Sequence, residues 1–173
     1  YIYIFSALSA FILLLAVVNF TNLATARSFL RAKEIGVRKT AGAYRGQLAK
    51  QILLIIKDQL LTPVGLRTLS PKDSRYRARY EGGVAERDGA YHQGTAWPFL
   101  LGPFVTAWLK TFGKSAKVKT EARDFLNGLE THLREACIGQ VSEIFDGDAP
   151  HYPRGCPAQA WSVAEPLRAM IED

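Results

Sequence analysis

The sequence has few cysteines and no phosphate-binding loop, and these absences exclude several classes of protein. The 173-residue chain has two cysteines, Cys137 and Cys156, which cannot form the disulfide framework of a small secreted domain and are typical of a reducing compartment. The Cys and His spacing of structural zinc sites is missing, so we predict neither a metal site nor a cofactor. The pattern GxxxxGK[ST] is missing too, so we predict no nucleotide-binding site.

Charged residues are absent from the start of the chain and unevenly distributed after it. Residues 1–26 carry no charge, whereas residues 1–57 together hold eight Lys or Arg and one acid, Glu34. The remainder holds the other 14 basic and 15 acidic residues of the chain, so residues 1–57 carry a net charge of +7 and residues 58–173 a net charge of −1, which sum to +6. A basic excess beside an apolar run indicates a membrane surface rather than nucleic acid.

The uncharged run predicts a transmembrane helix over residues 3–25. About 20 consecutive apolar residues are enough to cross the hydrocarbon core of a bilayer. Basic residues follow the run instead of preceding it, which argues against a signal peptide. The positive-inside rule then places residues 27–50 in the cytoplasm and the helix in a bacterial inner membrane. A buried core helix is the alternative, but such helices rarely run for 26 residues without a charge.

The basic stretch ATARSFLRAKEIGVRKTAGAYRGQLAKQILL resembles the cytoplasmic loop of FtsX-like and MacB-like ABC transporter permeases, with the pattern RxxEIGxRKxxGAxxxQ. The resemblance covers about residues 1–56 and implies a short helix that contacts a partner ATPase subunit. The residues that it assigns to this contact are Arg31, Glu34, Gly36, Arg38 and Gly42. Anchoring of the same cations to anionic lipid headgroups is the alternative. The hydrophobic run stops after residue 56, where a permease would continue into another membrane helix.

Residues 58–173 have the pattern of an all-α domain. Apolar residues recur at spacings of three and four over residues 97–112, 115–137 and 157–171, which predicts three helices. Pro103 should restart or kink the first helix, and Pro166 should strain the third. Residues 82–95 and 138–157 are rich in glycine and polar residues and are predicted loops. No alternating strand pattern of useful length is present.

Two motifs in these loops, RDGAYHQGTAWPFLLGPF and GQVSEIFDGDAPHYPRGCPAQAWSVAE, resemble the C-terminal catalytic domain of glycogen debranching enzymes, the amylo-α-1,6-glucosidase part. The resemblance covers about residues 59–173. It implies a partial (α/α)6 barrel containing only the last few helices, and glycogen or a branched maltooligosaccharide as substrate. The apolar faces that carry Phe104, Trp108 and Phe125 are then expected to lack packing partners.

The same resemblance implies the residues of a sugar site. An inverting glycosidase needs a carboxylic acid that protonates the leaving oxygen and a carboxylate about 6.5–9.5 Å away that activates water. Glu143 occupies the family's position for the general base, and the general acid, an aspartate, is expected upstream of this chain. The residues implied to line the glucose subsite, to orient Glu143 or to bind hydroxyl groups are Tyr91, His92, Gln93, Thr95, Trp97, Asp146, Asp148, Gln159 and Trp161.

Structural alternatives exist for several of these residues. Tryptophan at helical spacing usually belongs to a core, and we assign Trp108 to the core. Asp88 is as well suited to a helix cap or an ion pair as to acid catalysis. The segment from Asp146 to Asp148 resembles the start of a calcium loop, but the EF-hand pattern fails after it, so no metal site is predicted.

The sequence leaves three hypotheses. The chain is a glycoside hydrolase fragment that uses Glu143 as base and is inactive alone, a permease fragment coupled to an ATPase, or a chimera of two genes joined near residues 52–60. The join has no Gly, Ser or Pro linker, which favours a chimera with parts at 1–57 and 58–173. We favour the hydrolase as the functional content, in the cytoplasm, because its motifs cover two thirds of the chain.

Overall fold

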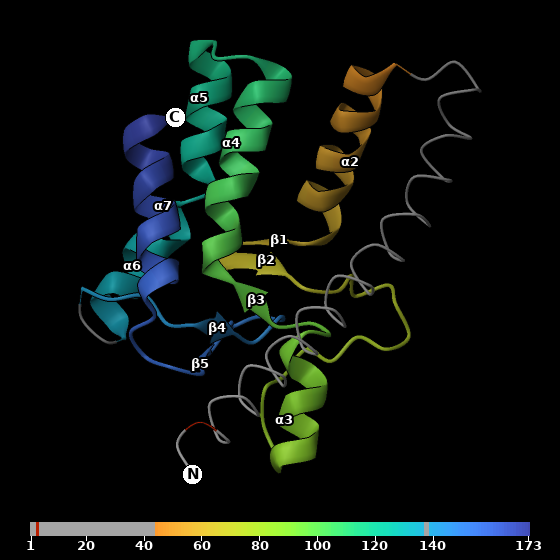
Figure 1. Cartoon of the computed structure of the whole chain (residues 1–173), viewed down its shortest axis with the longest axis vertical. Helices are drawn as coiled ribbons and strands as arrows, with labels where there is room; N and C mark the ends of the chain where they lie inside the picture. The colour runs from red at the N-terminus through yellow and green to blue at the C-terminus, as the bar shows by residue number, and fades with distance from the viewer. Residues whose placement is uncertain (1–2, 4–43, 137–138) are drawn as a thin grey trace. The chain divides into compact units, whose positions relative to one another are not determined.

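The computed structural model describes residues 3, 44–136 and 139–173 (Figure 1). The predicted membrane span and the five predicted ATPase-contact residues lie outside these ranges, apart from Tyr3 at the start of the span. Within the described ranges, no helix combines the length and the apolarity needed to cross a membrane. The chain divides into two compact units, Tyr1–Gln47 and Leu48–Asp173, and the fold below is that of the second.

Short strands alternate with helices along the described part of the chain. The helices are α2 (Arg45–Gln59), α3 (Val84–Tyr91), the 3-10 turn η1 (Pro98–Leu100), α4 (Leu101–Phe112), α5 (Ala116–Asp124), α6 (Asn127–Glu135) and α7 (Ala160–Glu172). The strands are β1 (Leu61–Thr62), β2 (Gly65–Arg67), β3 (Ala96–Trp97), β4 (Ile144–Phe145) and β5 (Pro153–Arg154). The expectation of a mainly helical domain is therefore confirmed.

The prediction of a strictly all-α domain was wrong, because the strands form one small sheet. Its order is β1-β2-β3-β4-β5, and each neighbouring pair is antiparallel. The strands are two or three residues long, too short for the alternation of inward and outward side chains that marks a strand in a sequence. The sheet brings β3 beside β4 through the pair Ala96 and Phe145, although 48 residues separate them in the sequence.

The predicted helix boundaries needed three corrections. Residues 115–137 form two helices, because the chain turns at Phe125 and Leu126 and buries both side chains. Gly128 then lies so close to the turn between β1 and β2 that a Cβ atom on it would be 2.0 Å from the Pro63 carbonyl oxygen. The predicted loop at 82–95 contains α3, on which Asp88 is exposed. The helix predicted over 97–112 starts later, because Trp97 lies in β3 and Pro98–Leu100 form η1, so that α4 begins two residues before Pro103. Pro166 lies inside α7, and the strain expected there stays a prediction.

The core lies between α4, α5 and α7, which run side by side in Figure 1. Helix α4 supplies one broad apolar face, and the buried residues on it are Leu101, Phe104, Val105, Trp108 and Leu109. Phe125 and Leu129 pack against this face, and Leu53 from α2 joins the same cluster. The expected exposure of Phe104, Trp108 and Phe125 was therefore wrong, because these aromatic side chains pack on one another.

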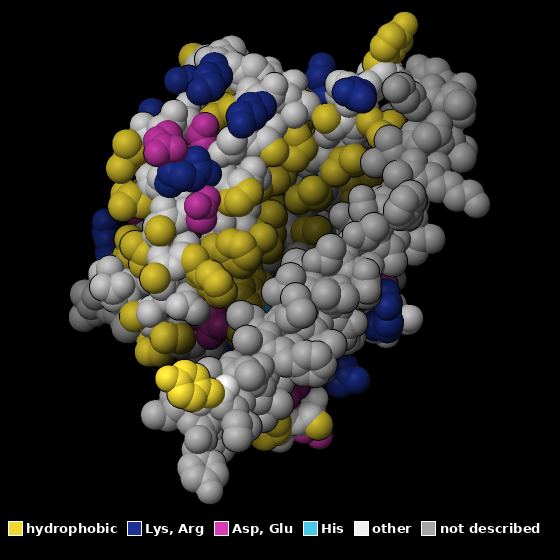
Figure 2. Space-filling view, viewed as in Figure 1, with side chains coloured by type: hydrophobic (Ala, Val, Ile, Leu, Met, Phe, Trp, Pro, Cys, Tyr) yellow, Lys and Arg dark blue, Asp and Glu magenta, His cyan; other side chains and the backbone are white. Residues whose placement is uncertain are grey.

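One face of α7 is apolar but exposed. Leu167, Met170 and Ile171 have 51%, 57% and 74% of their surface accessible, and Figure 2 shows hydrophobic side chains along this edge of the molecule. Exposed apolar residues at helical spacing indicate a surface suited to packing against further protein.

Candidate active site

Glu143 lies directly before β4, at the start of the hairpin formed by β4 and β5. Its backbone N–H donates to the Cys156 carbonyl oxygen at 2.8 Å, and the Cys156 N–H donates to Glu143 Oε2 at 2.9 Å. Gly155 has φ +67°, and a Cβ atom there would be 2.5 Å from Glu143 Oε2. The hairpin therefore needs glycine at this position, both for the left-handed backbone and for the close approach of the carboxylate.

The second oxygen of this carboxylate is held from a different part of the chain. The Tyr91 hydroxyl, at the last residue of α3, donates a hydrogen bond to Glu143 Oε1. Burial raises the pKa of Tyr91, and the hydrogen bond to Glu143 raises it further, so the phenol keeps its proton and remains a donor. Each carboxylate oxygen thus has one donor, and neither donor is a neighbour of Glu143 in the sequence.

Aromatic side chains surround the Tyr91–Glu143 contact. The Trp97 ring meets the Tyr91 ring edge-on at 4.8 Å between centroids and stacks on His92 at 5.5 Å. Trp161, on the first turn of α7, lies 6.3 Å from Trp97 and 5.4 Å from Phe99. We call Tyr91, His92, Trp97, Phe99 and Trp161 the aromatic cluster. His92 and Trp161 are its exposed members, so they form the surface that a ligand can meet.

Four of the predicted sugar-site residues also make contacts within the protein, and their role in binding sugar stays a prediction. Thr95 is fully buried, and its hydroxyl donates to the Tyr91 carbonyl oxygen at 2.6 Å and accepts from the Trp97 indole at 3.0 Å. Trp97 itself is only 4% exposed. Gln159 precedes α7, where its carbonyl oxygen accepts from Ser162 N at 3.1 Å. Gln93 has an exposed side chain, while its carbonyl oxygen accepts from Arg77 N at 2.7 Å.

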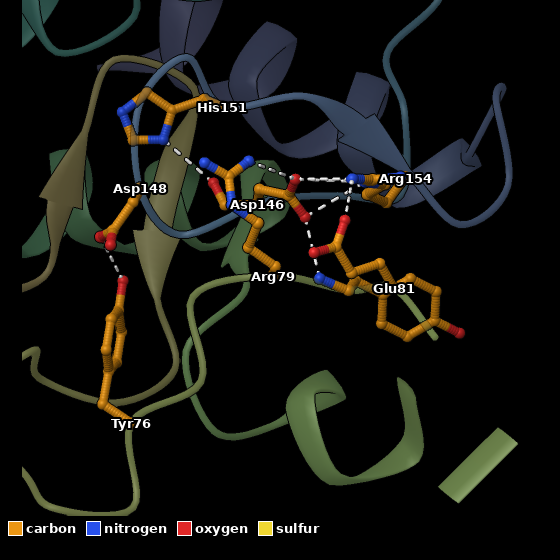
Figure 3. Close-up of polar contacts among 8 residues, drawn as sticks. Tyr76, Arg79, Glu81, Asp146, Asp148, His151 and Arg154 are labelled. Carbon is orange, nitrogen blue, oxygen red and sulfur yellow. Dashed lines mark hydrogen bonds and ion pairs between the residues drawn. The ribbon is translucent and has the colours of Figure 1, made fainter. Parts of the chain in front are cut away.

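The two aspartates after β4 differ in their surroundings (Figure 3). Asp146 is completely buried and pairs with Arg154 at 2.9 Å and with Arg79 at 3.6 Å. Asp148 is exposed and accepts from the Tyr76 hydroxyl at 2.7 Å. The sequence reasoning singled out both aspartates but missed both arginines, because nothing in their spacing relates them to a carboxylate at position 146.

Comparison with known proteins places the chain in a family. The sequence profile described as amylo-alpha-1,6-glucosidase matches residues 35–168. The chain belongs to the amylo-alpha-1,6-glucosidase family. The chain is also similar to the glycogen debranching enzyme of Saccharomyces cerevisiae, with 32% identity over 131 residues. That alignment covers 64% of this chain and 8% of the yeast protein, so the chain spans a small part of the length of that relative.

The amylo-alpha-1,6-glucosidase match bears on the predicted join near residues 52–60. The match spans the join, and α2 and β1 carry the chain through it with Leu53, Ile56 and Leu60 packed in the core. The comparisons give no support to the resemblance to a permease. Among the residues predicted to contact an ATPase, Gly36, Arg38 and Gly42 fall inside the matched range.

A buried histidine contacts the residue that precedes Glu143. His132 Nε2 accepts a hydrogen bond from Ser142 N at 3.2 Å, and its ring meets Phe145 edge-on at 4.6 Å. Burial lowers the pKa of His132, and the opposing effect of Glu135 is smaller. His132 is therefore neutral in the folded protein, and its Nε2 atom is the hydrogen-bond acceptor.

The lowered pKa of His132 predicts a loss of stability in acid. The unfolded chain takes up a proton near the ordinary value of 6.5, whereas the folded chain resists protonation, so stability is complete above pH 6.5 and falls below it. We expect urea unfolding at pH 7.5 and pH 5.0 to show a larger drop for the wild type than for His132→Gln. His92→Gln, at an exposed histidine, should keep the wild-type drop. Equal drops in the wild type and His132→Gln would contradict this assignment.

Proposed function

We propose that this chain is part of a glycoside hydrolase of the glycogen debranching type, in which Glu143 is the general base for cleavage of α-1,6-linked glucose. The observation that carries the proposal is a half-buried carboxylate whose two oxygens are held by the Tyr91 hydroxyl and the Cys156 amide, beside the aromatic cluster. Membership of the amylo-alpha-1,6-glucosidase family and the yeast relative support the substrate class.

The geometry of Glu143 suits the work of a base. A carboxylate oxygen has two lone-pair sites, and each oxygen of Glu143 uses one of them for a donor from the protein. The remaining sites can accept a hydrogen bond from a water molecule and then its proton. Two fixed donors also prevent rotation of the carboxylate, so that the direction of proton transfer is set before the substrate binds.

The general acid is expected from another part of the full enzyme. Inversion requires a second carboxyl group about 6.5–9.5 Å from the base. The nearby carboxylates of this segment are already paired, since Asp146 is buried against Arg154 and Asp148 binds Tyr76. We therefore propose that this chain alone does not hydrolyse glycogen.

We further propose that α4 to α7 are part of an (α/α)6 barrel. The helices lie adjacent and share one core. The exposed apolar face at Leu167, Met170 and Ile171 supports the proposal, because such a face is suited to packing against the remaining helices.

Binding of a sugar tests the proposed substrate class. A glucose ring presents an apolar C–H face, and the exposed Trp161 ring is the surface on which such a face can pack. We expect isothermal titration calorimetry to detect binding of a branched maltooligosaccharide, weakened about tenfold in Trp161→Ala, which corresponds to about 1.4 kcal/mol. Leu167→Ala, on the same helix, is the control and should bind like the wild type. Absence of binding, or equal affinity of all three proteins, would count against a sugar site here.

A further inference from the structure

Asp146 binds Arg154 (Figure 3) and accepts a hydrogen bond from Tyr80 N, and each of these partners lies close to one of the two donors of the Glu143 carboxylate. We propose that Asp146 is a positioning residue, which fixes the Cys156 amide through Arg154 and the Tyr91 hydroxyl through Tyr80. The proposal rests on the proposed role of Glu143 and adds to it the device that prepares the base. It also distinguishes the two roles open to Asp146, because a carboxylate occupied by protein donors is not available to sugar hydroxyl groups.

The first connection runs along the β4–β5 hairpin. Arg154 donates from Nε to Asp146 Oδ1 at 3.1 Å and from Nη2 to Oδ2 at 2.9 Å. The Asp146 N–H also donates to the Tyr152 carbonyl oxygen at 2.9 Å. The side chain of Asp146 therefore holds β5, and its backbone holds the residue that precedes β5. Cys156, whose N–H donates to Glu143, follows Arg154 by two residues, so the placement of its amide depends on this clamp.

The second connection runs through the segment before α3. Tyr80 N donates to Asp146 Oδ1 at 2.9 Å, and the next residue of the hairpin, Gly147, donates from its N–H to the Ala78 carbonyl oxygen at 2.6 Å. These bonds hold the segment against the hairpin. The Tyr80 ring then packs on the Tyr91 ring at 5.7 Å between centroids, beside the hydroxyl that donates to Glu143.

The burial of Asp146 explains why its contacts position their partners firmly. A carboxylate with no exposed surface is costly unless charged and polar partners compensate it, so a shift of Arg154 or Tyr80 leaves a buried charge partly unpaired. Asp146→Asn keeps the shape of the side chain but removes the charge. It also points an amide donor at the guanidinium of Arg154, which is itself only a donor, and this releases β5.

The test uses the full chain and reads the two donors separately by nuclear magnetic resonance. Hydrogen exchange reports the Cys156 amide, and a 13Cζ-tyrosine label, assigned with Tyr91→Phe, reports the Tyr91 hydroxyl. We expect Asp146→Asn to speed exchange of the Cys156 amide by about tenfold or more, while the Leu109 amide in α4 changes much less. The Tyr91 resonance should move towards its position in Glu143→Gln.

Asp148→Asn is the matched control. It makes the same change two residues away at an exposed carboxylate that binds Tyr76, so both signals should stay as in the wild type. Wild-type signals in a folded Asp146→Asn would overturn the proposal. If Asp146→Asn does not fold, Arg154→Lys, which keeps the charge but loses the planar fork, tests the first connection: it should speed exchange of the Cys156 amide, and an unchanged rate would overturn the proposal. Neither signal requires catalysis. The positioning role of Asp146 can therefore be wrong while Glu143 is the base, and it can be right while another group is the base.

Discussion

Replacing Glu143 with glutamine is expected to lower the release of glucose from a limit dextrin by about 10³-fold, the usual size of a general-base contribution. The measurement uses the yeast debranching enzyme with its matching segment replaced by that of this chain, because we expect the chain alone to release no glucose. Glutamine keeps the size of the side chain and can still accept from Tyr91. It cannot take a proton from water, so the loss should fall on kcat and not on KM.

A matched substitution shows whether this loss is specific. Glu165 lies on α7, where it pairs with Arg168 at 3.2 Å, and Glu165→Gln should keep the rate within about twofold of the unmodified enzyme. A Glu143→Gln enzyme that retains more than about a tenth of the rate would show that another group activates the water. Release of glucose by the chain alone would show that the general acid also lies within it.

The second large effect is expected in the core. Trp108 is 3% exposed, and its ring packs against Phe104, Phe112 and Phe125 at centroid distances of 5.8, 4.3 and 5.3 Å. Trp108→Ala removes these contacts and leaves a cavity, so we expect the free energy of unfolding to fall by about 3–5 kcal/mol. This is a large fraction of the roughly 5–15 kcal/mol that a domain of this size has.

The chain supplies its own control for this experiment. Trp161 has 48% of its surface exposed, and Trp161→Ala should cost less than about 1 kcal/mol. Urea unfolding followed by far-UV circular dichroism measures both variants without relying on tryptophan emission. Equal losses for the two tryptophans would mean that the packing around α4 is not the main source of stability.

The burial of Trp108 could be predicted from the sequence. The spacing of apolar residues over 97–112 predicted a helix with one buried face, and Trp108 lies on that face. This worked because the period of a helix is a local property that the sequence carries directly. The motifs around Tyr91 and Glu143 likewise predicted two residues that the structure brings into contact, although not the hydrogen bond between them.

The helix predicted over 115–137 failed for the opposite reason. Its apolar period continues through Phe125 and Leu126, but the close contact of Gly128 with Pro63 belongs to a part of the chain more than 60 residues away. The five short strands were not predicted either, because they too depend on distant parts of the chain. A strand of two residues has no period, and its existence depends wholly on the neighbour with which it pairs.

By itself, the sequence determined the buried face of α4 and the family motifs, and it predicted Glu143 as a site residue, because periodicity and motif order need no knowledge of distant neighbours. Only the tertiary structure decided which groups hold that carboxylate. Tyr91 precedes Glu143 in the sequence and Cys156 follows it, and both donate to its carboxylate. In our proposal, Asp146 positions these two donors through Tyr80 and Arg154. Those contacts are set by the folding of short strands and loops against one another, and no local pattern encodes them.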